Sequence, residues 1–290
     1  MIVKAARRAL PIFIEQSKRD VKDAPHRPNP HMWPDQGLHA AWIGHTTVLL
    51  KIDGLTILTD PVFSTRIGLN FGPLTVGMKR LVAPALTEEE CPRPDLILLS
   101  HAHMDHFDLP SLRALESPHT KVITAHRTSD LLRVKRYGAV HELRWNDAVR
   151  VGEALVSAFE VRHWGARMQT DTFRGYNGYV IETPGYRVLF GGDTAMTNLF
   201  RNLRSSARYD LAIMPIGAYN PWVHAHCNPE EALQMANDAG ADFILPVHHK
   251  TFSLSSEPVN EPIERLRSAL AKDPERLVLG SIGEESVVAA

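Results

Sequence analysis

The sequence has few cysteines and no long apolar run. Its 290 residues include two cysteines, Cys91 and Cys227, which stand alone and offer neither a disulfide framework nor a thiolate metal cluster. A reducing compartment, the cytoplasm, therefore fits the chain. No apolar stretch approaches the roughly 20 residues that a membrane-spanning helix needs. These absences argue against a disulfide-stapled secreted domain and against a membrane-spanning protein.

An excess of charge of one sign is also lacking. The chain carries 32 Lys and Arg against 33 Asp and Glu, which gives a formal net charge of -1. Because nonspecific nucleic-acid binding needs a basic face, this balance argues against nucleic acid as a partner. With 44% hydrophobic residues, the chain is long enough for one large domain or two small ones with a proper core.

The first 35 residues differ in character from the rest. Met1 to Asp20 combines basic residues with a short apolar stretch, Leu10 to Ile14, and is interpreted as a short amphipathic helix that packs on the body or mediates association. Peripheral membrane contact and homo-oligomerisation are the partner hypotheses that it leaves open. Asp23 to Asp35 is rich in proline and predicts an irregular lead-in. The predicted organisation is a lead-in over residues 1–35 and a single domain over residues 36–290.

Strand patterns come first in each half of the chain, and helices follow them. Strands and hairpins are predicted over residues 39–43, 46–52, 55–59, 95–99, 122–124, 149–161, 178–182, 187–190, 211–214, 243–247 and 277–279. Helices are predicted over residues 109–115, 129–137, 229–239 and 262–271. Phe63 to Pro84, with its glycines and prolines, predicts a long functional loop. The pattern indicates an α+β protein with two sheets packed face to face, one from each half, and helices outside.

Histidine is abundant, with 15 residues, and three of them fall in the segment His-Ala-His-Met-Asp-His that follows the apolar strand Leu96 to Leu99. In a nearly extended segment alternate residues point the same way, so His101 and His103 can reach one point. Asp105 and His106 follow where the chain turns and can reach a second point. The spacing predicts a two-metal site of roughly 3.5–4 Å separation. A purely structural zinc site is disfavoured because such sites normally use cysteine.

One segment cannot fill two metal positions, and three further candidates stand at predicted strand ends. His163 follows a strand that ends at Val161, and His248 follows one that ends at Val247. Asp193 follows an apolar strand and two glycines, which allow close backbone approach to a ligand. A carboxylate at this position can bridge two cations because it has two oxygens.

These motifs resemble those of the metallo-β-lactamase superfamily. The HxHxDH segment and the later His163, Asp193 and His248 match the ligand positions of that superfamily. Other stretches are similar to the branch that contains the N-acyl-phosphatidylethanolamine-hydrolysing phospholipase D and its bacterial relatives. The matching stretches include Trp42 to Thr47, Asp60 to Ser64, Leu99 to His101, Gly192 to Thr194, Pro215 to Tyr219, Asn228 to Ala232 and Thr251-Phe252.

The resemblance implies a four-layer αββα sandwich with a dinuclear centre, usually of zinc, with Mn²⁺ and Fe²⁺ as alternatives. The ligands that it implies are, for one ion, His101, His103 and His163; for the other, Asp105, His106 and His248; and as the bridge, Asp193. His226 matches a family histidine that lies beside the metals.

The chemistry expected of such a site is hydrolysis by a hydroxide formed from water between two cations, which Asp105 would help to orient. Protonation of the leaving group needs an acid, for which His226 is the first candidate and His45 the second. The leading prediction is a phosphodiesterase of the phospholipase D type that acts on a small-molecule or lipid-like substrate. Trp164 and Trp222 are candidates to line the cleft, although aromatic residues that flank strand ends more often belong to the core or the rim. The alternatives are a lactonase or other C–O ester hydrolase with the same site and, outside catalysis, a metal-binding scaffold.

Overall fold

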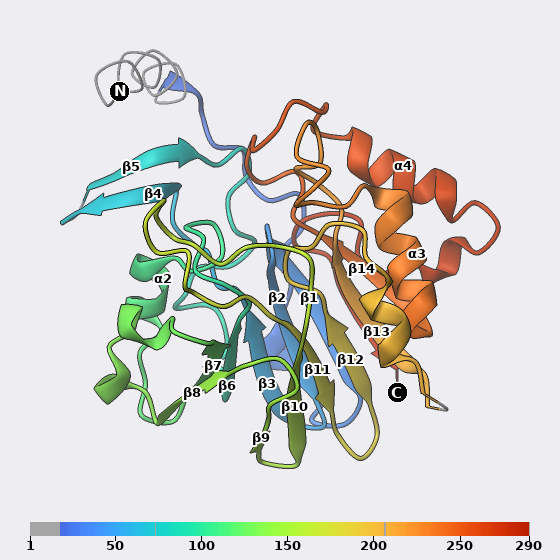
Figure 1. Ribbon diagram of the computed structural model, residues 1–290, viewed down its shortest axis with the longest axis horizontal. Helices are drawn as coiled ribbons and strands as arrows, with labels where there is room; N and C mark the ends of the chain where they lie inside the picture. Colours follow the sequence, from blue (N-terminus) through green and yellow to red (C-terminus); the bar gives the residue numbers. More distant parts are fainter. Residues whose placement is uncertain (1–17, 73, 206, 290) are drawn as a thin grey trace.

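The computed structural model describes residues 18–72, 74–205 and 207–289, and two β-sheets that face each other form its centre (Figure 1). The predicted N-terminal helix lies, up to residue 17, outside the described residues. The lead-in that follows is irregular apart from a bridge between Lys22 and Val82 and one 3-10 turn, η1 (Pro30–Met32). The division into a lead-in and a single domain stays a prediction.

The first sheet has seven strands in the order β15-β1-β2-β3-β6-β7-β8. Their bounds are β1 (Leu38–Gly44), β2 (Thr47–Ile52), β3 (Leu55–Thr59), β6 (Leu96–Leu99), β7 (Lys121–Ala125), β8 (Ala139–Leu143) and β15 (Glu285–Ala289). Strands β3, β6, β7 and β8 run parallel, and the other pairs are antiparallel. Because β15 comes from the end of the chain, the prediction of one sheet from each half is wrong for this strand. It is a short, half-exposed edge strand, so its apolar pattern is weak.

The second sheet has six strands in the order β14-β13-β12-β11-β10-β9. Their bounds are β9 (Ala148–Val151), β10 (Ala154–Phe159), β11 (Gly178–Glu182), β12 (Arg187–Phe190), β13 (Tyr209–Pro215) and β14 (Ala241–Val247). The strands β12, β13 and β14 run parallel, so their carboxyl ends meet at one edge of the sheet. A site at this edge can therefore draw residues from several distant parts of the chain.

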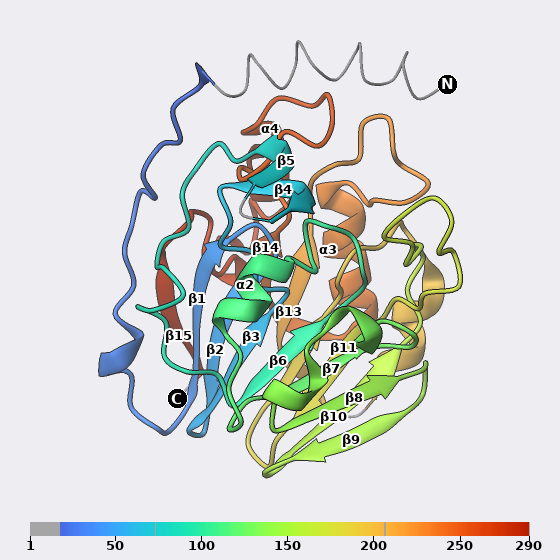
Figure 2. The ribbon, with the colours of Figure 1, turned by 90° about the vertical axis from the view of Figure 1, so that its left-hand side faces the viewer.

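Apolar side chains fill both faces of each sheet, which explains the unbroken apolar runs in the sequence. In β6, Leu96 and Leu98 belong to the core between the two sheets, whereas Ile97 and Leu99 face the outer layer. Helix α2 (Leu109–Ala114) covers that outer face of the first sheet (Figure 2). Helices α3 (Pro229–Ala239) and α4 (Glu261–Ala269) cover the outer face of the second. The predicted four-layer αββα sandwich is confirmed.

Helix α3 begins as the sequence predicts. The Asn228 side chain accepts a hydrogen bond from the backbone N–H of Glu231 at 2.9 Å, and the Glu231 carboxylate accepts one from the N–H of Asn228 at 3.0 Å. Pro229 occupies the first turn, where its missing N–H has no cost. The helix ends at Gly240, whose φ of 87° is the left-handed conformation that glycine adopts easily.

Three local predictions are wrong. Residues 63–84 hold a hairpin of β4 (Arg66–Phe71) and β5 (Leu74–Lys79), which stands away from both sheets, instead of a loop without elements (Figure 1). The paired glycines of this hairpin hide its strand pattern; a Cβ on Gly77 would lie 1.9 Å from the carbonyl oxygen of Ile67. Residues 129–137 form two 3-10 turns, because the chain becomes extended at Leu132. The predicted strand 277–279 makes only an isolated bridge through Leu277.

The remaining short elements are the 3-10 turns η2 (Ser129–Leu131), η3 (Val134–Arg136), η4 (Asn198–Leu203) and η5 (Pro274–Arg276). Over the described part of the chain, no helix combines the length and the apolar content that crossing a bilayer requires. Cytoplasmic location, peripheral membrane contact and homo-oligomerisation stay predictions.

Candidate metal centre

The predicted site residues follow the ends of strands from both sheets, and the fold brings them together. The first sheet supplies His45, from the turn after β1, and the residues from His101 to His106, which follow β6. The second sheet supplies His163 after β10, Asp193 after β12 and His248 after β14. Two bulky residues close to this edge, His45 and His248, have positive φ angles of 54° and 64°. Such backbone strain is typical of functional sites.

One group of side chains unites three histidines with Asp193. The ligand atoms of His101, His103, His163 and Asp193 all lie within 4.8 Å of one another. The His103 Nδ1 atom is 2.7 Å from His101 Nε2 and 3.3 Å from His163 Nε2. His163 is held in this direction because its other nitrogen, Nδ1, donates to the carbonyl oxygen of Ala225 at 3.0 Å. The geometry matches the ligand set expected for the first ion.

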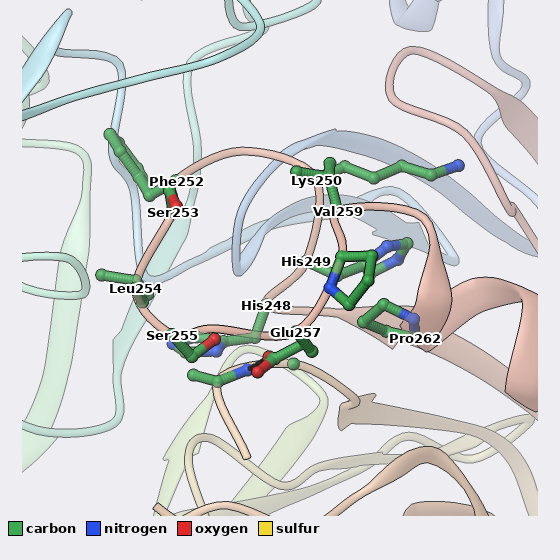
Figure 3. Close-up of a pocket in the computed structure, with 13 residues that line it drawn as sticks. His248, His249, Lys250, Phe252, Ser253, Leu254, Ser255, Glu257, Val259 and Pro262 are labelled. Atoms are coloured by element: carbon green, nitrogen blue, oxygen red, sulfur yellow. Dashed lines mark hydrogen bonds between the residues drawn. The ribbon is translucent and has the colours of Figure 1, made fainter. Parts of the chain in front are cut away.

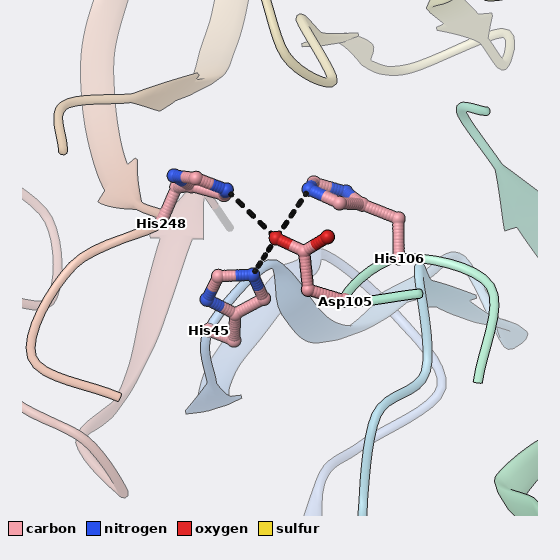
Figure 4. A group of neighbouring side chains, drawn as sticks. All are labelled: His45, Asp105, His106 and His248. Atoms are coloured by element: carbon pink, nitrogen blue, oxygen red, sulfur yellow. Dashed lines mark hydrogen bonds and ion pairs between the residues drawn. The ribbon is translucent and has the colours of Figure 1, made fainter. Parts of the chain in front are cut away.

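A second group surrounds one oxygen of Asp105 (Figure 4). The Oδ2 atom of Asp105 lies 3.1 Å from His45 Nε2, 3.3 Å from His248 Nε2 and 3.6 Å from His106 Nε2. His106 and His248 were expected here as ligands of the second ion. His45 was expected as an acid, and its presence in this group is new.

Asp193 lies between the two groups. Its Oδ2 atom is 3.1 Å from His106 Nε2, 3.3 Å from His248 Nε2 and 3.7 Å from His163 Nε2. The same oxygen is 3.7 Å from His226 Nδ1, and Asp193, His226 and His248 form a third compact group. This central place is the one expected of a bridging carboxylate. The preceding Gly192 has a φ of 56°, and a Cβ there would lie 2.7 Å from the Ser100 Cβ.

Charge in the site favours a cation. Although burial raises the pKa of Asp105 and Asp193, the imidazole of His106 and its neighbours hold both values well below 3.8. Burial lowers the pKa of His106, but the two carboxylates outweigh it and raise the value well above 6.5. Burial keeps the pKa of His101 and His163 well below 6.5, so both rings are neutral, the form that binds metal.

Some buried polar atoms at the centre lack a hydrogen bond, although His106 Nε2 forms an ion pair with Asp193 Oδ2 at 3.1 Å. In the described part of the chain, His106 Nε2 and Asp193 Oδ1 are buried without a hydrogen bond. Buried polar atoms in proteins are nearly always paired, and each exception calls for an explanation. A divalent cation would take up these lone pairs and would supply the positive charge that the carboxylates now draw to His106. The residues present therefore fit a metal ion.

Asp60 supports the site from behind, although the sequence analysis gave it no role. Its Oδ2 atom accepts a hydrogen bond from His106 Nδ1 at 2.7 Å and another from the Ser100 hydroxyl at 2.5 Å. The Ser100 backbone N–H donates to the other carboxylate oxygen at 2.7 Å. The Nδ1 bond leaves Nε2 of His106 directed to the centre. The signal in the sequence is an aspartate directly after an apolar strand, similar to Asp193, which follows its strand after two glycines.

The comparisons with known proteins agree with this geometry. The family model described as the beta-lactamase superfamily domain matches residues 56–249. The chain belongs to the metallo-β-lactamase superfamily. An uncharacterised protein of Mycobacterium tuberculosis is 34% identical over 263 residues, which cover 87% of this chain and 68% of that protein.

The branch within the superfamily follows from a second relative. A mitochondrial N-acyl-phosphatidylethanolamine-hydrolysing phospholipase D of Saccharomyces cerevisiae is 32% identical over 79% of this chain and 51% of that protein. The chain belongs to the branch of the metallo-β-lactamase superfamily whose members are similar to this phospholipase D. For the fold, a metallo hydrolase from Ignicoccus hospitalis superposes with a TM-score of 0.64 at 20% identity, over 87% of this chain and 98% of its own.

A cavity of about 230 Å³ leads to the centre. His103, Asp105, Asp193 and His248 form its floor, and Trp164, Trp222 and Leu254 form walls. Trp164 and Trp222 are 45% and 46% exposed, and both line the cavity, the less favoured of the two interpretations of the sequence. Among the described residues, no lysine or arginine lines this cavity.

A second, much smaller cavity shares lining residues with the first, and Figure 3 shows its lining. Its volume is about 30 Å³. His249, Phe252 and Glu257 line it, on the loop that follows β14. The two cavities share His248 and Leu254, so this loop forms a wall of the site. The larger cavity is the one with space for a substrate.

The two predicted acids occupy different places. His226 lines the larger cavity, and burial lowers its pKa to about 4, so the ring is neutral at pH 7. His45 is 1% exposed and does not line that cavity, and burial lowers its pKa to about 3. His45 therefore does not fit the role of an acid that meets the substrate.

Proposed function

We propose that this protein is a metal-dependent hydrolase that cleaves phosphodiester bonds at a dinuclear, zinc-preferring centre. The observation that carries the proposal is the convergence of histidines and carboxylates around Asp105 and Asp193 on the floor of a cavity large enough for a substrate. The similarity to the yeast phospholipase D supports the choice of a phosphodiester. The chain spans about half the length of that relative. An activity like that of the whole yeast enzyme is therefore proposed for this chain and does not follow from the similarity alone.

The proposed ligands are His101, His103 and His163 for one ion, Asp105, His106 and His248 for the other, and Asp193 between them. A pair of divalent cations, when bound, lowers the pKa of a water molecule and offsets the negative charge of the transition state. The chain contributes to this by holding neutral imidazoles and ionised carboxylates at fixed positions. Asp60 and the carbonyl oxygen of Ala225 fix two of the rings through their other nitrogens.

His226 is the proposed proton carrier. Its ring is neutral at pH 7, lines the cavity and lies 3.7 Å from the Asp193 carboxylate. A neutral imidazole accepts the proton that the attacking water loses. The ring then returns the proton to the leaving oxygen. This role differs from that of an acid already protonated in the resting state.

The cavity walls select the substituents of the substrate. Trp164, Trp222 and Leu254 present apolar surface, and the described lining offers no lysine or arginine to pair with additional phosphates. A lipid-like or aromatic substituent gains free energy by burial against these walls. The same observation favours a second candidate, a lactonase or other C–O ester hydrolase, because an uncharged ester also needs no cationic wall.

Metal analysis and a substrate panel test the proposal. The purified protein is expected to hold close to two zinc ions per chain and to hydrolyse bis(p-nitrophenyl) phosphate. A chelator should abolish this activity, and added zinc should restore it. Lactones in the same panel decide between the two candidate bonds, and vesicles of N-acyl-phosphatidylethanolamine test the lipid substrate.

Substitutions provide the controls. Asp193→Ala and His103→Ala should lower both metal content and hydrolysis, whereas the exposed His31→Ala, far from the centre, should change neither. A wild-type protein with under one metal ion per chain, unchanged in the site variants, would overturn the dinuclear centre. Two bound ions without hydrolysis of any ester would support the metal-binding scaffold.

A further inference from the structure

His45 contacts the metal centre without contacting the cavity. Its Nε2 atom donates a hydrogen bond to Asp105 Oδ2 at 3.1 Å (Figure 4). The two other imidazoles at this oxygen, His106 and His248, also approach Asp193 Oδ2, at 3.1 and 3.3 Å. Within the described residues, His45 has no ion pair with Asp193. Of the two carboxylates at the centre, His45 therefore forms an ion pair with Asp105 alone.

The backbone fixes His45 more firmly than a turn residue requires. Its φ of 54° is uncommon for a residue with a side chain. The backbone N–H of His45 donates to the Thr251 hydroxyl at 2.7 Å. Its carbonyl oxygen accepts hydrogen bonds from the Trp42 indole at 2.8 Å and from the backbone N–H of His248 at 3.1 Å. Three separate partners thus hold this strained residue in place, and one of them is a proposed metal ligand.

The ring of His45 is enclosed on its other sides. Its centroid lies 4.4 Å from that of His248 and 5.1 Å from that of Phe252. The side chain is 1% exposed, so no substrate in the cavity reaches it. A hydrogen-bond donor behind a metal-ligating carboxylate fixes the orientation of that ligand.

We propose that His45 is a positioning residue, which fixes the Asp105 carboxylate for the ion held with His106 and His248. The inference rests on the proposed function only in requiring an ion at this position, and it holds for any bond that the enzyme cleaves. Without the hydrogen bond from His45, the Asp105 carboxylate could rotate away from His106 and His248. The affinity for one ion would fall, and the ion at His101, His103 and His163 would be bound as before.

Two variants separate the hydrogen bond from packing. His45→Gln keeps an N–H donor, and His45→Phe keeps a ring against Phe252 and His248 but cannot donate. The apo proteins are titrated with zinc in competition with a chelator. His45→Phe is expected to weaken one of the two binding steps by about 10–100-fold, and His45→Gln by much less. The matched control is His39→Gln, a buried histidine on β1 whose ring bonds to the carbonyl of Gln36.

The reverse order of the two variants, with His45→Phe normal and His45→Gln weakened, would overturn the proposal in favour of packing. Equal weakening in both would overturn it in favour of direct ligation by the ring. Normal two-step binding in both would remove any role in metal binding. A wild-type chain that binds no zinc would instead count against the proposed function itself.

A double-mutant cycle tests that His45 acts through Asp105. In a chain that carries Asp105→Ala, the further change His45→Phe is expected to cause no additional loss of zinc affinity. An additional loss equal to that in the wild-type background would show that His45 acts independently of this carboxylate. Thermal unfolding of each apo variant shows whether the chain is folded before metal is added.

Discussion

The two sheets supply the metal centre in different ways. The first sheet provides His101, His103, Asp105 and His106 in one continuous segment after a single strand. The second provides single residues, such as Asp193, each after a different strand. Local chain geometry arranges the continuous segment, whereas the single residues reach the centre only when both sheets pack together. The first contribution is thus a property of a motif, and the second is a property of the fold.

The largest effect is expected when one ligand from each sheet is removed, Asp193 from the second sheet or His103 from the first. Asp193→Ala removes the carboxylate that lies within 4.0 Å of imidazoles from both groups, and His103→Ala removes one imidazole of one group. Asp193→Ala should lose both ions and reduce hydrolysis to background, because no other carboxylate takes the central place. His103→Ala should retain the ion on the Asp105 side. Metal content per chain and the hydrolysis rate, measured together for both variants, check this prediction. If the two variants retained metal equally, the prediction would be contradicted.

Removing a residue that supports a proposed ligand should reduce zinc affinity by less than removing a ligand itself. Asp60→Asn removes the charge that accepts the hydrogen bond from His106 Nδ1 at 2.7 Å. Zinc affinity at one position should fall by about 10–100-fold, as is typical when the residue behind a ligating histidine is lost. Chelator competition measures the change. The control is Asp95→Asn, an exposed carboxylate of the same sheet that accepts from the backbone N–H of Thr56 at 2.8 Å. A similar loss in both variants would argue against a specific role for Asp60.

The same contrast explains how much of the site the sequence could predict. The segment from His101 to His106 is recognisable because its ligand spacing is local. Asp193 and His248 were identified at strand ends, but the sequence could not show that they meet. The support that Asp60 gives to His106, across 46 positions, depends on two parallel strands lying side by side. The role of His45 depends on a turn packing against Asp105 across 60 positions.

The helices and strands also divide into those that local sequence signals predict and those that depend on pairing with other parts of the chain. Helix α3 was predicted within its observed bounds, because Asn228, Pro229 and Glu231 are local signals of a helix start. The hairpin β4–β5 was missed because Gly68 and Gly77 face each other across it and interrupt the alternation of side chains. Strand β15 was missed because pairing with β1 across the whole chain, rather than its own pattern, makes it a strand.

The wall of the cavity allows a comparison that concerns the substrate instead of the metal ligands. Trp222 lines the cavity and is 46% exposed, while the adjacent Val223 is 61% exposed and does not line it. Trp222→Ala should raise KM for a lipid-like or aromatic phosphodiester by roughly tenfold, since part of the substrate's apolar surface stays in water. The kcat should change little, and metal content should not change. Steady-state kinetics on both variants measures this; an equal rise in KM for Val223→Ala would contradict the assignment of the wall.

The smallest expected effect concerns the helix that covers the second sheet. Asn228 caps α3 by accepting from the N–H of Glu231 at 2.9 Å, whereas Asn260 stands before α4 without a side-chain cap bond. Asn228→Ala should lower the free energy of unfolding by about 0.5–2 kcal/mol, and Asn260→Ala should lower it by much less. Denaturant unfolding of the two apo variants, matched in residue type, measures the difference. Equal loss in both would show that the residue type, rather than the hydrogen bond, stabilises the helix start. Although α3 packs against β14, which His248 follows, a stability loss confined to Asn228→Ala should leave zinc affinity unchanged as long as the chain is folded.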